Sequence, residues 1–526
     1  MTPPHPPARP AATGGKLPLA DVIVIGGGPA GATAARLLAK WGHAVSLLTR
    51  APSRYALAES LPPSCGRLLD LVGIRPAVER CGFLRSTGNT VRWGAGEARI
   101  EQFAHDERGH QIERSAFDAL LLTEAAASGT TVHEARVREV APDAAPGAGG
   151  LTRVGFDSAG YGGNIAARWV LDCTGRAGLL ARRGRRRGET GARTMAIVGV
   201  WENAGGFATA DETHTLVESF EDGWAWSVPV SLERRYVTLM VDPEVTALAG
   251  RRGLAPIYLA ELARTNVMSA LVRGAGLLGR PWARDASPYR AERTASEGLL
   301  LVGDAASFVD PLSSYGIKKA IASAWLAAVV THTALTDARR TSAALGLYES
   351  RERAMYETLR ARAAELSRDA GGVAPAPFWA ERAEPGDSGR AGYAPDGGPA
   401  NVALGGFAGP DVAAFRRDAD VLGALEEMKR RPRVRFRSSP AVRRTALPTV
   451  RGNEVVLETH LVAPAFADGV RWLRSVDLVK IVELADAYEQ VPDLYEAYNR
   501  AAPPAALPDF LGALSVLVGK GLLEMT

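Results

Sequence analysis

Lysine and cysteine are scarce in this chain of 526 residues. Only seven lysines stand among the 62 basic residues, and none of them lies between Lys40 and Lys318. The three cysteines, Cys65, Cys81 and Cys173, form no Cys-x-x-Cys pair. This argues against a disulfide framework and against a zinc site, so no metal is expected, and it fits a reducing cytoplasm.

Long apolar runs are also missing. No run of about 18 apolar residues occurs, so we expect no membrane span. Residues 1–18, MTPPHPPARPAATGGKLP, are rich in proline and lack the apolar core of a signal peptide, which predicts a disordered tail. The formal net charge is only +4, which argues against nucleic acid as a partner. The length of the chain predicts two or more domains.

A glycine-rich segment follows the first apolar stretch. A short strand leads into GGGPAGATAARLLAKWGH, which places glycines at Gly26, Gly28 and Gly31. Gly26 permits the tight turn, Gly28 lets a pyrophosphate approach the backbone, and Gly31 lets helix and strand pack closely. A helix over 29–41, whose free N-terminal amides can hold an anion, and a strand over 44–48 complete the pattern of a dinucleotide site.

The second strand departs from the usual dinucleotide pattern at its end. It ends in Leu47-Leu48-Thr49-Arg50, where such folds place an Asp or Glu that accepts a hydrogen bond from the adenosine ribose. Thr49 can make a weaker hydrogen bond, so the segment predicts a dinucleotide site with a looser adenosine end.

Two later stretches indicate which dinucleotide binds. RWVLDCTGR at 168–176 predicts a strand ending in Thr174-Gly175, and GLLLVGDAASFVDPLSSYGIKKA at 298–320 predicts a strand, a Gly-Asp turn, a loop and a helix. Together with the first segment they resemble the FAD-dependent monooxygenase and halogenase superfamily, which has a para-hydroxybenzoate-hydroxylase-like fold. The resemblance implies an α/β (α+β) fold in which a Rossmann-like FAD-binding domain is interleaved with a β-sheet substrate domain.

The resemblance also implies roles for individual residues. The Thr174-Gly175 strand end would lie beside the FAD phosphates, Asp304 would hold the ribityl chain, and the helix starting near Gly316 would point its N-terminus at the flavin. An arginine at a helix start, here Arg114, would approach the phosphates; a surface arginine is an equally good interpretation. The residues expected around FAD are Gly26, Gly28, Pro29, Ala30, Gly31, Thr49, Arg50, Glu59, Ser60, Arg114, Thr174, Gly175, Gly303, Asp304, Pro311, Gly316 and Ile317.

Two further stretches resemble flavin-dependent halogenases. YALAESLPPSCG, from residue 55, is similar to their GESLPP stretch, and DGWAWSVP, at 222–229, is similar to their Trp-x-Trp-x-Ile-Pro motif. Residues two apart in a strand share a face, so Trp224 and Trp226 should project together and, with Pro229, line a substrate cavity. The alternative is an ordinary aromatic core pair.

The absence of lysine between Lys40 and Lys318 argues against halogenation. The resemblance implies a lysine soon after the GESLPP-like stretch in halogenases, and the nearest candidate here is Arg85, which stays protonated. Some of them also use a Glu in the loop after the Gly-Asp turn, where this chain has Ser313. SFVDPLSSYGIKKA, STGNTVRWGAGE and ERGHQIERSAFDALL, within 20–360, are instead similar to flavoproteins that hydroxylate a protein tryptophan during quinone-cofactor maturation.

That resemblance implies a FAD-dependent monooxygenase whose substrate is a tryptophan side chain of a peptide or protein. Its flavin C4a-hydroperoxide would be attacked by the indole ring. Because only one Gly-x-Gly-x-x-Gly segment occurs, electrons would come from NAD(P)H directly or through a flavin reductase, with O2 as oxidant. Candidate polar helpers are Glu59, His110 and Tyr315, although His110 is more typical of a hydrogen-bonded structural residue. The alternatives are a tryptophan-type halogenase and an assembly or binding protein whose flavin is structural.

The domain bounds follow from the same motifs. We expect FAD-binding segments over about 19–84, 110–182 and 290–340, substrate-domain segments over about 85–109 and 190–289, a helix over 343–369, a linker over 371–411 and a C-terminal domain over 412–526.

The C-terminal domain begins with a basic stretch, KRRPRVRFRSSPAVRR at 429–444. It predicts a strand with one charged face, either a solvated edge or a binding patch. From 453, strands and helices over 475–487 and 491–500 precede a last helix, and the order resembles a winged-helix domain. The last helix carries an apolar face of Phe510, Leu511, Leu514, Leu517 and Val518. It is too apolar to read DNA, which leaves peptide recognition or a structural, dimer-forming role.

Overall fold

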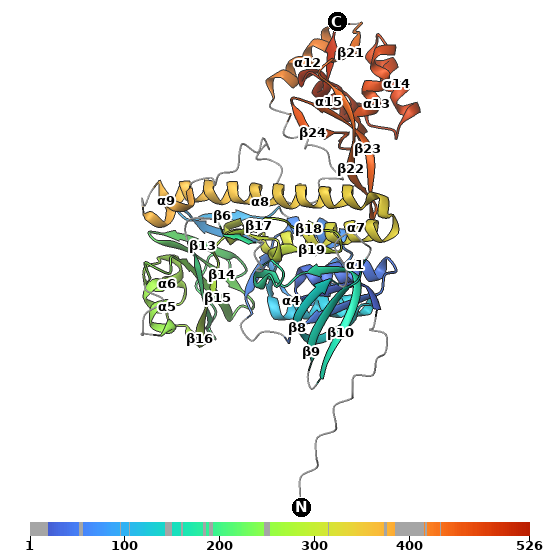
Figure 1. Ribbon diagram of the computed structural model, residues 1–526. Coiled ribbons are helices and arrows are strands. Elements are labelled where there is room, and N and C mark those ends of the chain that lie inside the picture. The colour runs from blue at the N-terminus through green and yellow to red at the C-terminus, as the bar shows by residue number, and fades with distance from the viewer. Residues whose placement is uncertain are drawn as a thin grey trace, which may run out of the picture. The chain divides into compact units, whose positions relative to one another are not determined.

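The computed structural model describes most of the chain, and the predicted tail at 1–18 lies outside the described residues. The described residues are 19–51, 56–94, 96–104, 106–142, 150–158, 161–181, 186–188, 193–246, 253–313, 315–372, 376–383, 415, 418–431 and 433–526. Two compact units result, Met1–Ala328 with Glu352–Gly389, and Val329–Arg351 with Arg390–Thr526. The division passes through two long helices, α7 (Gly316–Thr336) and α8 (Thr341–Gly371) (Figure 1).

The first unit contains a seven-stranded sheet with a parallel centre. Its strands are β1 (Leu19–Ile25), β2 (Val45–Thr49), β8 (Thr131–Pro142), β9 (Thr152–Ser158), β10 (Tyr161–Asp172), β18 (Ala295–Ser296) and β19 (Leu299–Leu301). β1 lies between β2 and β10 and runs parallel to both, and β10 is parallel to β19. The sequence VIVI in β1 is buried along its length, because a central parallel strand is covered on both faces. Helices α1 (Pro29–Lys40) and α4 (Arg114–Ala127) pack against each other beside this sheet.

A second seven-stranded sheet in the same unit is antiparallel except where β5 pairs with β13. In spatial order its strands are β16 (Gly276–Asp285), β12 (Met195–Glu202), β15 (Arg234–Val241), β14 (Gly223–Pro229), β13 (Thr215–Phe220), β5 (Gly88–Arg92) and β6 (Arg99–Gln102). One face, which includes Ala225 and Leu239, packs on α5 (Leu254–Ala263) and α6 (Val267–Leu271). The other face carries Trp224 and Met240, because side chains alternate along a strand.

Two small sheets also belong to the first unit. The first is formed by β3 (Ala58–Leu61), β7 (Gly109–Glu113) and β4 (Leu84–Ser86), and the second by β11 (Arg186–Gly188), β17 (Tyr289–Ala291) and β20 (Ser307–Phe308). β3 lies close to β14, so the segment AESL approaches the tryptophan-bearing strand. The predicted partner of β14, ERRYVTLMVDPE, is β15.

The predicted linker at 371–411 is wrong for part of its length. Residues 377–383 form a helix, α9 (Pro377–Ala383), in which Phe378 and Trp379 are almost fully buried. The glycine- and proline-rich composition of the stretch concealed these two aromatic side chains, whose burial is favourable enough to order this short helix. Residues 373–375 and 384–411 lie outside the described part of the chain.

The second unit has its own apolar core, built from helices and short strands. Its elements are α12 (Ala419–Arg430), β21 (Phe436–Ser438), β22 (Arg443–Arg451), β23 (Glu454–Ala463), β24 (Phe466–Val470), β25 (Trp472–Leu473), β26 (Val476–Asp477), α13 (Leu478–Leu484), α14 (Val491–Ala501), α15 (Leu507–Gly519) and β27 (Leu523–Met525). The helix expected over 475–487 begins only at Leu478, because Asp477 caps it by accepting a hydrogen bond from the Lys480 amide at 3.2 Å. The winged-helix assignment stays a prediction.

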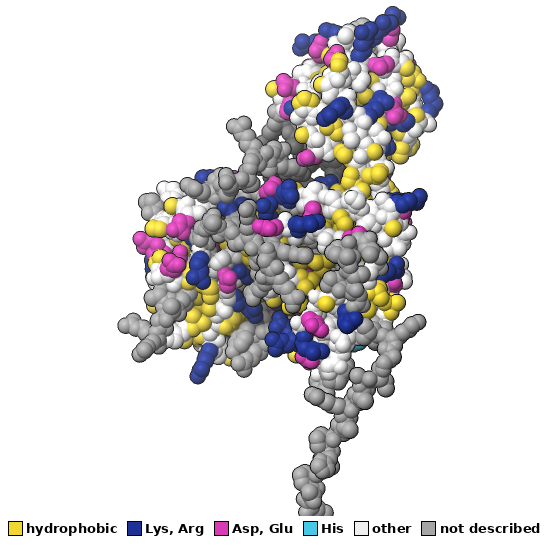
Figure 2. Space-filling view, viewed as in Figure 1, with side chains coloured by type: hydrophobic (Ala, Val, Ile, Leu, Met, Phe, Trp, Pro, Cys, Tyr) yellow, Lys and Arg dark blue, Asp and Glu magenta, His cyan; other side chains and the backbone are white. Residues whose placement is uncertain are grey.

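The basic stretch 429–444 does not form one strand. Its first residues close α12, and β21 covers only three residues, with Phe436 buried. Several of its basic side chains form ion pairs with neighbouring carboxylates. Among them, Lys429 pairs with Glu426 at 2.8 Å and Arg431 pairs with Glu427 at 2.6 Å. Figure 2 shows basic and acidic side chains interspersed over this unit. Within the described residues, no helix of the chain has the length and apolarity needed to cross a bilayer.

Candidate functional site

The turn between β1 and α1 requires glycine at two positions. Gly26 has φ +108°, and a Cβ there would lie 2.3 Å from the Cys173 carbonyl oxygen. A Cβ on Gly31 would lie 1.8 Å from the Gly26 oxygen. Side chains are therefore excluded where the turn touches the end of β10, and the first amides of α1 stay open to an anion.

The end of β10 is held by a carboxylate that sequence reasoning did not single out. Asp172 is fully buried, and its Oδ1 accepts hydrogen bonds from the Thr174 amide at 3.0 Å and the Thr174 hydroxyl at 2.6 Å. Its Oδ2 accepts from the Leu180 amide at 2.8 Å. Thr174 and Gly175 thus form a rigid turn, and the Asp-x-Thr-Gly spacing was the signal that could have identified Asp172.

The Gly-Asp turn after β19 lies against the start of α1. Gly303 has φ +63°, and a Cβ there would lie 3.2 Å from the Ala30 Cβ. Lys319, only 5% exposed, donates to the Gly303 carbonyl at 3.1 Å and to the Ser307 carbonyl, and its Nζ lies 3.3 Å from Asp304 Oδ1. Lys319 therefore fixes the turn that presents Asp304, a role that the sequence alone did not show.

Four predicted cofactor residues meet at one place. Arg114 at the start of α4 forms an ion pair with Glu59 of β3 at 2.6 Å, and its Nη2 would lie 3.8 Å from a Cβ on Gly28. A Cβ on Gly316, at the start of α7, would lie 3.4 Å from Glu59 Oε2. Burial opposes the charge of Arg114, but Glu59 and Asp118 raise the pKa of Arg114 above its usual value. The arginine is thus held beside the glycine turn and is not a free surface side chain.

A lysine reaches the AESLPPSCG segment although none stands near it in the sequence. Lys318 of α7 donates to the Ser64 hydroxyl at 3.1 Å, and its Nζ lies 5.0 Å from the centre of the Tyr315 ring. Only 5% of Lys318 is exposed, and burial lowers the pKa of its ammonium. The neighbouring Ile317 is also buried, whereas Gly316 is exposed.

His110 is engaged with Arg85 on the adjacent strand. Arg85 lies 2.6 Å from His110 Nε2 and 2.8 Å from Glu79. A guanidinium can only donate, so His110 Nε2 accepts and the imidazole is neutral. Burial and the charge of Arg85 both lower the pKa of His110. These contacts are typical of a hydrogen-bonded structural histidine. They also provide Arg85 with two partners inside the protein, His110 and Glu79.

The remaining predicted positions are placed without a decisive contact. Thr49 donates to the Arg50 carbonyl at 3.3 Å and lies where a Cβ on Gly27 would collide with it. Ser60 pairs with Gln111 across β3 and β7, and Pro311 opens a short 3-10 turn ahead of α7. Their contacts to a cofactor stay predictions.

Trp224 and Trp226 share a face of β14, as their spacing predicts. Their rings stack with centroids 4.8 Å apart. Trp93 meets Trp224 edge-on at 6.4 Å, and Trp379 of α9 meets Trp93 at 5.4 Å. Trp224 is 2% exposed and Trp226 is partly exposed, while Pro229 is buried at the end of the strand. Trp224 is therefore a core residue, and Trp226 is the one of the two whose exposed surface a substrate could contact.

A buried carboxyl adjoins this tryptophan cluster (Trp93, Trp224, Trp226 and Trp379). Asp310 is 8% exposed, and its Oδ1 accepts a hydrogen bond from the Leu312 amide at 3.2 Å. Burial raises the pKa of Asp310 to about 6, against the opposing charge of Arg382. The indole of Trp224 is close enough to lower that pKa slightly. Asp310 can thus hold or release a proton near neutral pH, a property that its sequence neighbours do not reveal.

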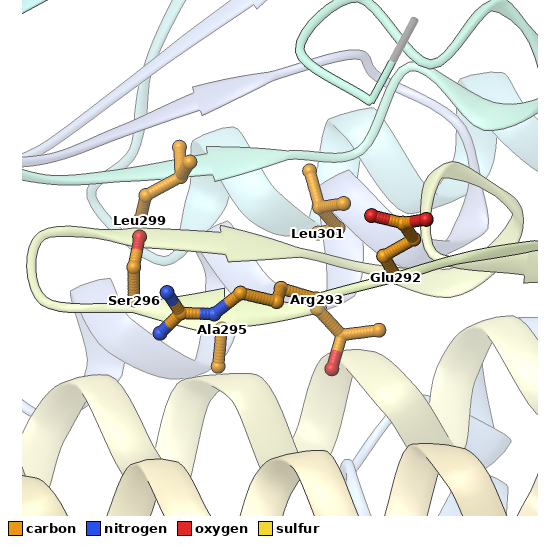
Figure 3. A pocket seen from close by; sticks show the side chains of 7 residues that line it. Glu292, Arg293, Ala295, Ser296, Leu299 and Leu301 are labelled. Atoms are coloured by element: carbon orange, nitrogen blue, oxygen red, sulfur yellow. The ribbon is translucent and has the colours of Figure 1, made fainter. Parts of the chain in front are cut away.

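Figure 3 shows a small pocket elsewhere in the first unit. Its volume is about 130 Å³ and it lies at the β18–β19 hairpin, lined by Glu292, Arg293, Thr294, Ala295, Ser296, Leu299 and Leu301. Small-molecule sites usually measure about 300–1,000 Å³. The pocket contains none of the predicted site residues and is too small for a dinucleotide.

Comparison with known proteins decides the family. The family described as "FAD binding domain" matches residues 19–363, well over half of the chain. The chain belongs to this FAD-binding family. Its mixed α/β fold agrees with the fold that the sequence predicted, and the chain spans about 60% of the length of the first curated relative that it matches.

Individual relatives include both chemistries. A tryptophan 2-halogenase of Chondromyces crocatus is 32% identical over 327 residues, which cover 58% of this chain and 60% of that one. The structure of CmlS, a flavin-dependent halogenase, is similar with a TM-score of 0.74 at 22% identity, covering 96% and 95% of the two chains. The peptidyl tryptophan dihydroxylase QhpG gives a TM-score of 0.66 at 23% identity, covering 96% and 99%. At these identities, the two structures show the fold alone.

The residues of this FAD-binding protein fit the cofactor. The Gly26–Gly31 turn leaves room for a diphosphate at a helix N-terminus, and Arg114 faces it from α4. Asp304 lies on the turn that follows β19, and the buried ammonium of Lys318 belongs to the first turn of α7. Among the described residues, no cluster of His, Cys, Asp and Glu side chains is suited to a metal.

Proposed function

We propose that this FAD-dependent oxidoreductase hydroxylates an electron-rich aromatic ring, the tryptophan side chain of a peptide or protein. The observation that carries the proposal is the position of Arg85. This cation is the candidate in this chain for the lysine that halogenases have soon after the GESLPP-like stretch, and it contacts Glu79 at 2.8 Å and His110 at 2.6 Å. An arginine so held stays protonated and has no free amine to take up an oxidised halogen.

The protein's own groups would bind and orient the cofactor. When bound, FAD would supply oxygen activation, with O2 as oxidant and electrons from NAD(P)H directly or through a flavin reductase. The amides of the Gly26–Gly31 turn and Arg114 would hold the diphosphate, and Asp304 would accept hydrogen bonds from the ribityl hydroxyls. Lys319 would act indirectly, because it holds the turn that carries Asp304 in place.

The tryptophan side of the site would exclude water and orient the substrate ring. Trp226 presents its partly exposed face from a rigid stack with Trp224. Exclusion of water matters because a wet site loses activated oxygen as hydrogen peroxide. Asp310, whose pKa burial raises to about 6, would accept a proton at its carboxylate in this region. An indole needs no stronger base.

The second unit would hold the peptide that carries the tryptophan. Its sheet β22–β23–β24 has β22 at one edge, and the exposed side chains of Arg443 and Arg444 begin that strand. A peptide strand can add to such an edge through main-chain hydrogen bonds. This role and the winged-helix assignment rest on the resemblance of the element order.

Halogenation is a second candidate, because curated relatives are named halogenases and because Lys318 lies against Ser64. The deciding experiment supplies purified FAD-loaded protein with a reductant, O2 and a tryptophan-containing peptide, with and without bromide. We expect mass spectrometry to show added oxygen atoms in both cases. A brominated peptide would overturn the proposal, and a flavin that is reduced and reoxidised without changing any peptide would favour a binding protein.

A further inference from the structure

Two adjacent lysines at the start of α7 have very different surroundings. Lys318 and Lys319 are both 5% exposed. Lys319 has Asp304 at 3.3 Å and donates to two backbone carbonyls. Lys318 has the Ser64 hydroxyl at 3.1 Å, the Tyr315 ring, and the thiol of Cys65, whose pKa burial raises to about 11 and which is therefore neutral. Within the described part of the chain, no carboxylate pairs with Lys318.

An ammonium in this state is costly to the protein by itself. Burying a charge without an opposite charge is strongly unfavourable, and one hydroxyl does not offset it. Lys319 shows that the same helix turn can satisfy a buried lysine when the neighbouring groups are provided. The isolation of Lys318 therefore indicates an anion that arrives from outside the polypeptide.

The place of Lys318 in the fold narrows the choice of anion. It lies two positions after Gly316, where the 21-residue helix α7 begins and its N-terminal end carries partial positive charge. Gly316 in turn adjoins Glu59, the partner of Arg114 at the glycine turn. The helix end and the ammonium thus add positive charge at the flavin end of the proposed cofactor site, beyond the residues that would hold the diphosphate.

We propose that Lys318 is the counter-ion of the reduced flavin and sets its reduction potential. Oxidised flavin takes up two electrons and one proton to become a monoanion, and Lys318 neutralises that charge without giving up its own proton. The inference rests on FAD occupying the proposed site, and it is independent of whether the product is hydroxylated or halogenated. Lys318 acts here as an electrostatic residue, with its Ser64 hydrogen bond holding the ammonium in place.

The test measures the midpoint potential of the bound FAD by dithionite reduction, without any peptide substrate. Lys318→Met keeps the length of the side chain and removes its charge. We expect binding of reduced relative to oxidised FAD to fall about 10- to 100-fold. This lowers the two-electron potential by about 30 to 60 mV. Lys318→Arg should restore most of the wild-type value, and Lys480→Met, which removes a partly exposed lysine paired with Glu483, should leave it unchanged.

A second readout separates this role from a structural one. Because the buried cation is unpaired in the apoprotein, Lys318→Met should leave the apoprotein at least as resistant to denaturant as the wild type. A structural lysine would give the opposite result, a destabilised apoprotein with an unchanged potential, and this would overturn the proposal. Ser64→Ala, which removes only the hydrogen bond, should lower the potential by less than Lys318→Met and provides a second, milder test.

A free halide ion, and not the reduced flavin, could also be the anion that Lys318 binds, and the test must distinguish the two. Potentials are therefore measured in chloride-free buffer and again with added chloride. A potential that depends on Lys318 without chloride supports the flavin as the anion. A potential that responds to Lys318 only when chloride is present would assign the site to the halide and overturn the proposal. A failure to hydroxylate peptide would change neither result, so the two proposals fail separately.

Discussion

The nucleotide side and the tryptophan side of the first unit are built from different kinds of contact. The nucleotide side relies on backbone: glycine turns at Gly26 and Gly303, the ends of β10 and β19, and helix N-termini. The tryptophan side relies on packed rings contributed by β14, by residues next to β5 and by α9. Backbone geometry tolerates almost no change, whereas a packed aromatic wall can be rebuilt with different rings. The first side therefore identifies the cofactor, and the second leaves the substrate to be tested.

The sharpest test of the backbone side is Gly31→Ala. Its Cβ would lie 1.8 Å from the Gly26 oxygen, so the turn must move and the proposed diphosphate site should be lost. We expect purified protein without flavin absorbance and with no measurable FAD binding by calorimetry. Gly512→Ala is the matched control, because its Cβ meets nothing within 4 Å on α15. A Gly31→Ala protein that retains FAD would show that the turn is not the phosphate site.

On the tryptophan side, we expect two neighbouring positions to behave differently. Trp224→Ala empties a fully buried site and should lower the free energy of unfolding by about 3–5 kcal/mol. Trp226→Ala removes a partly exposed ring and should cost about 1–2 kcal/mol, with the larger effect on peptide turnover. Denaturant unfolding and steady-state kinetics measure the two effects. Equal losses of stability at both positions would contradict the assignment of Trp224 to the core and Trp226 to the site.

Asp310 predicts a pH dependence of stability on the tryptophan side. Its folded-state pKa of about 6 lies above the ordinary value of 3.8, so the folded state binds more protons between these values. The free energy of unfolding should fall as pH rises from about 4 to about 6, by at most about 3 kcal/mol, and stay level above. Asp310→Asn keeps an oxygen for the Leu312 amide and should remove this fall. The check is denaturant unfolding of both proteins across that pH range, and parallel curves would refute the assignment.

The last expected effect is on FAD binding, at the ion pair that joins β3 to α4. Arg114→Gln would remove the proposed charge-assisted contact to the diphosphate and leaves Glu59 without its 2.6 Å partner. We expect FAD affinity to fall about 10- to 100-fold, which corresponds to about 1.5–3 kcal/mol. Arg99→Gln, which breaks an exposed pair with Glu101, is the control and should have no effect. If FAD affinity is unchanged in Arg114→Gln, Arg114 does not bind the cofactor and its role is purely structural.

How much the sequence could reveal differed between the two sides. The glycine turn, the Thr174-Gly175 strand end and the Gly-Asp turn were predicted because each is a local backbone requirement with few sequence solutions. The structural role suggested for His110 stays a prediction, and its partner Arg85 could not be known without the register of β4 and β7. Lys318 was missed as a neighbour of Ser64, since 254 residues separate them along the chain. The aromatic residues of α9 were missed because their composition resembled a linker.

The sequence by itself determined the FAD-binding fold and the shared face of Trp224 and Trp226, since spacing fixes direction in a strand and glycine fixes a turn. Only the tertiary structure decided which of the two tryptophans is core, because Trp93 and Trp379 arrive from distant segments. It also decided that Arg114 meets Glu59 and that Lys318 stands without a carboxylate among the described residues. Local conformation follows from neighbouring residues, whereas burial and charge pairing depend on contacts made across the whole unit.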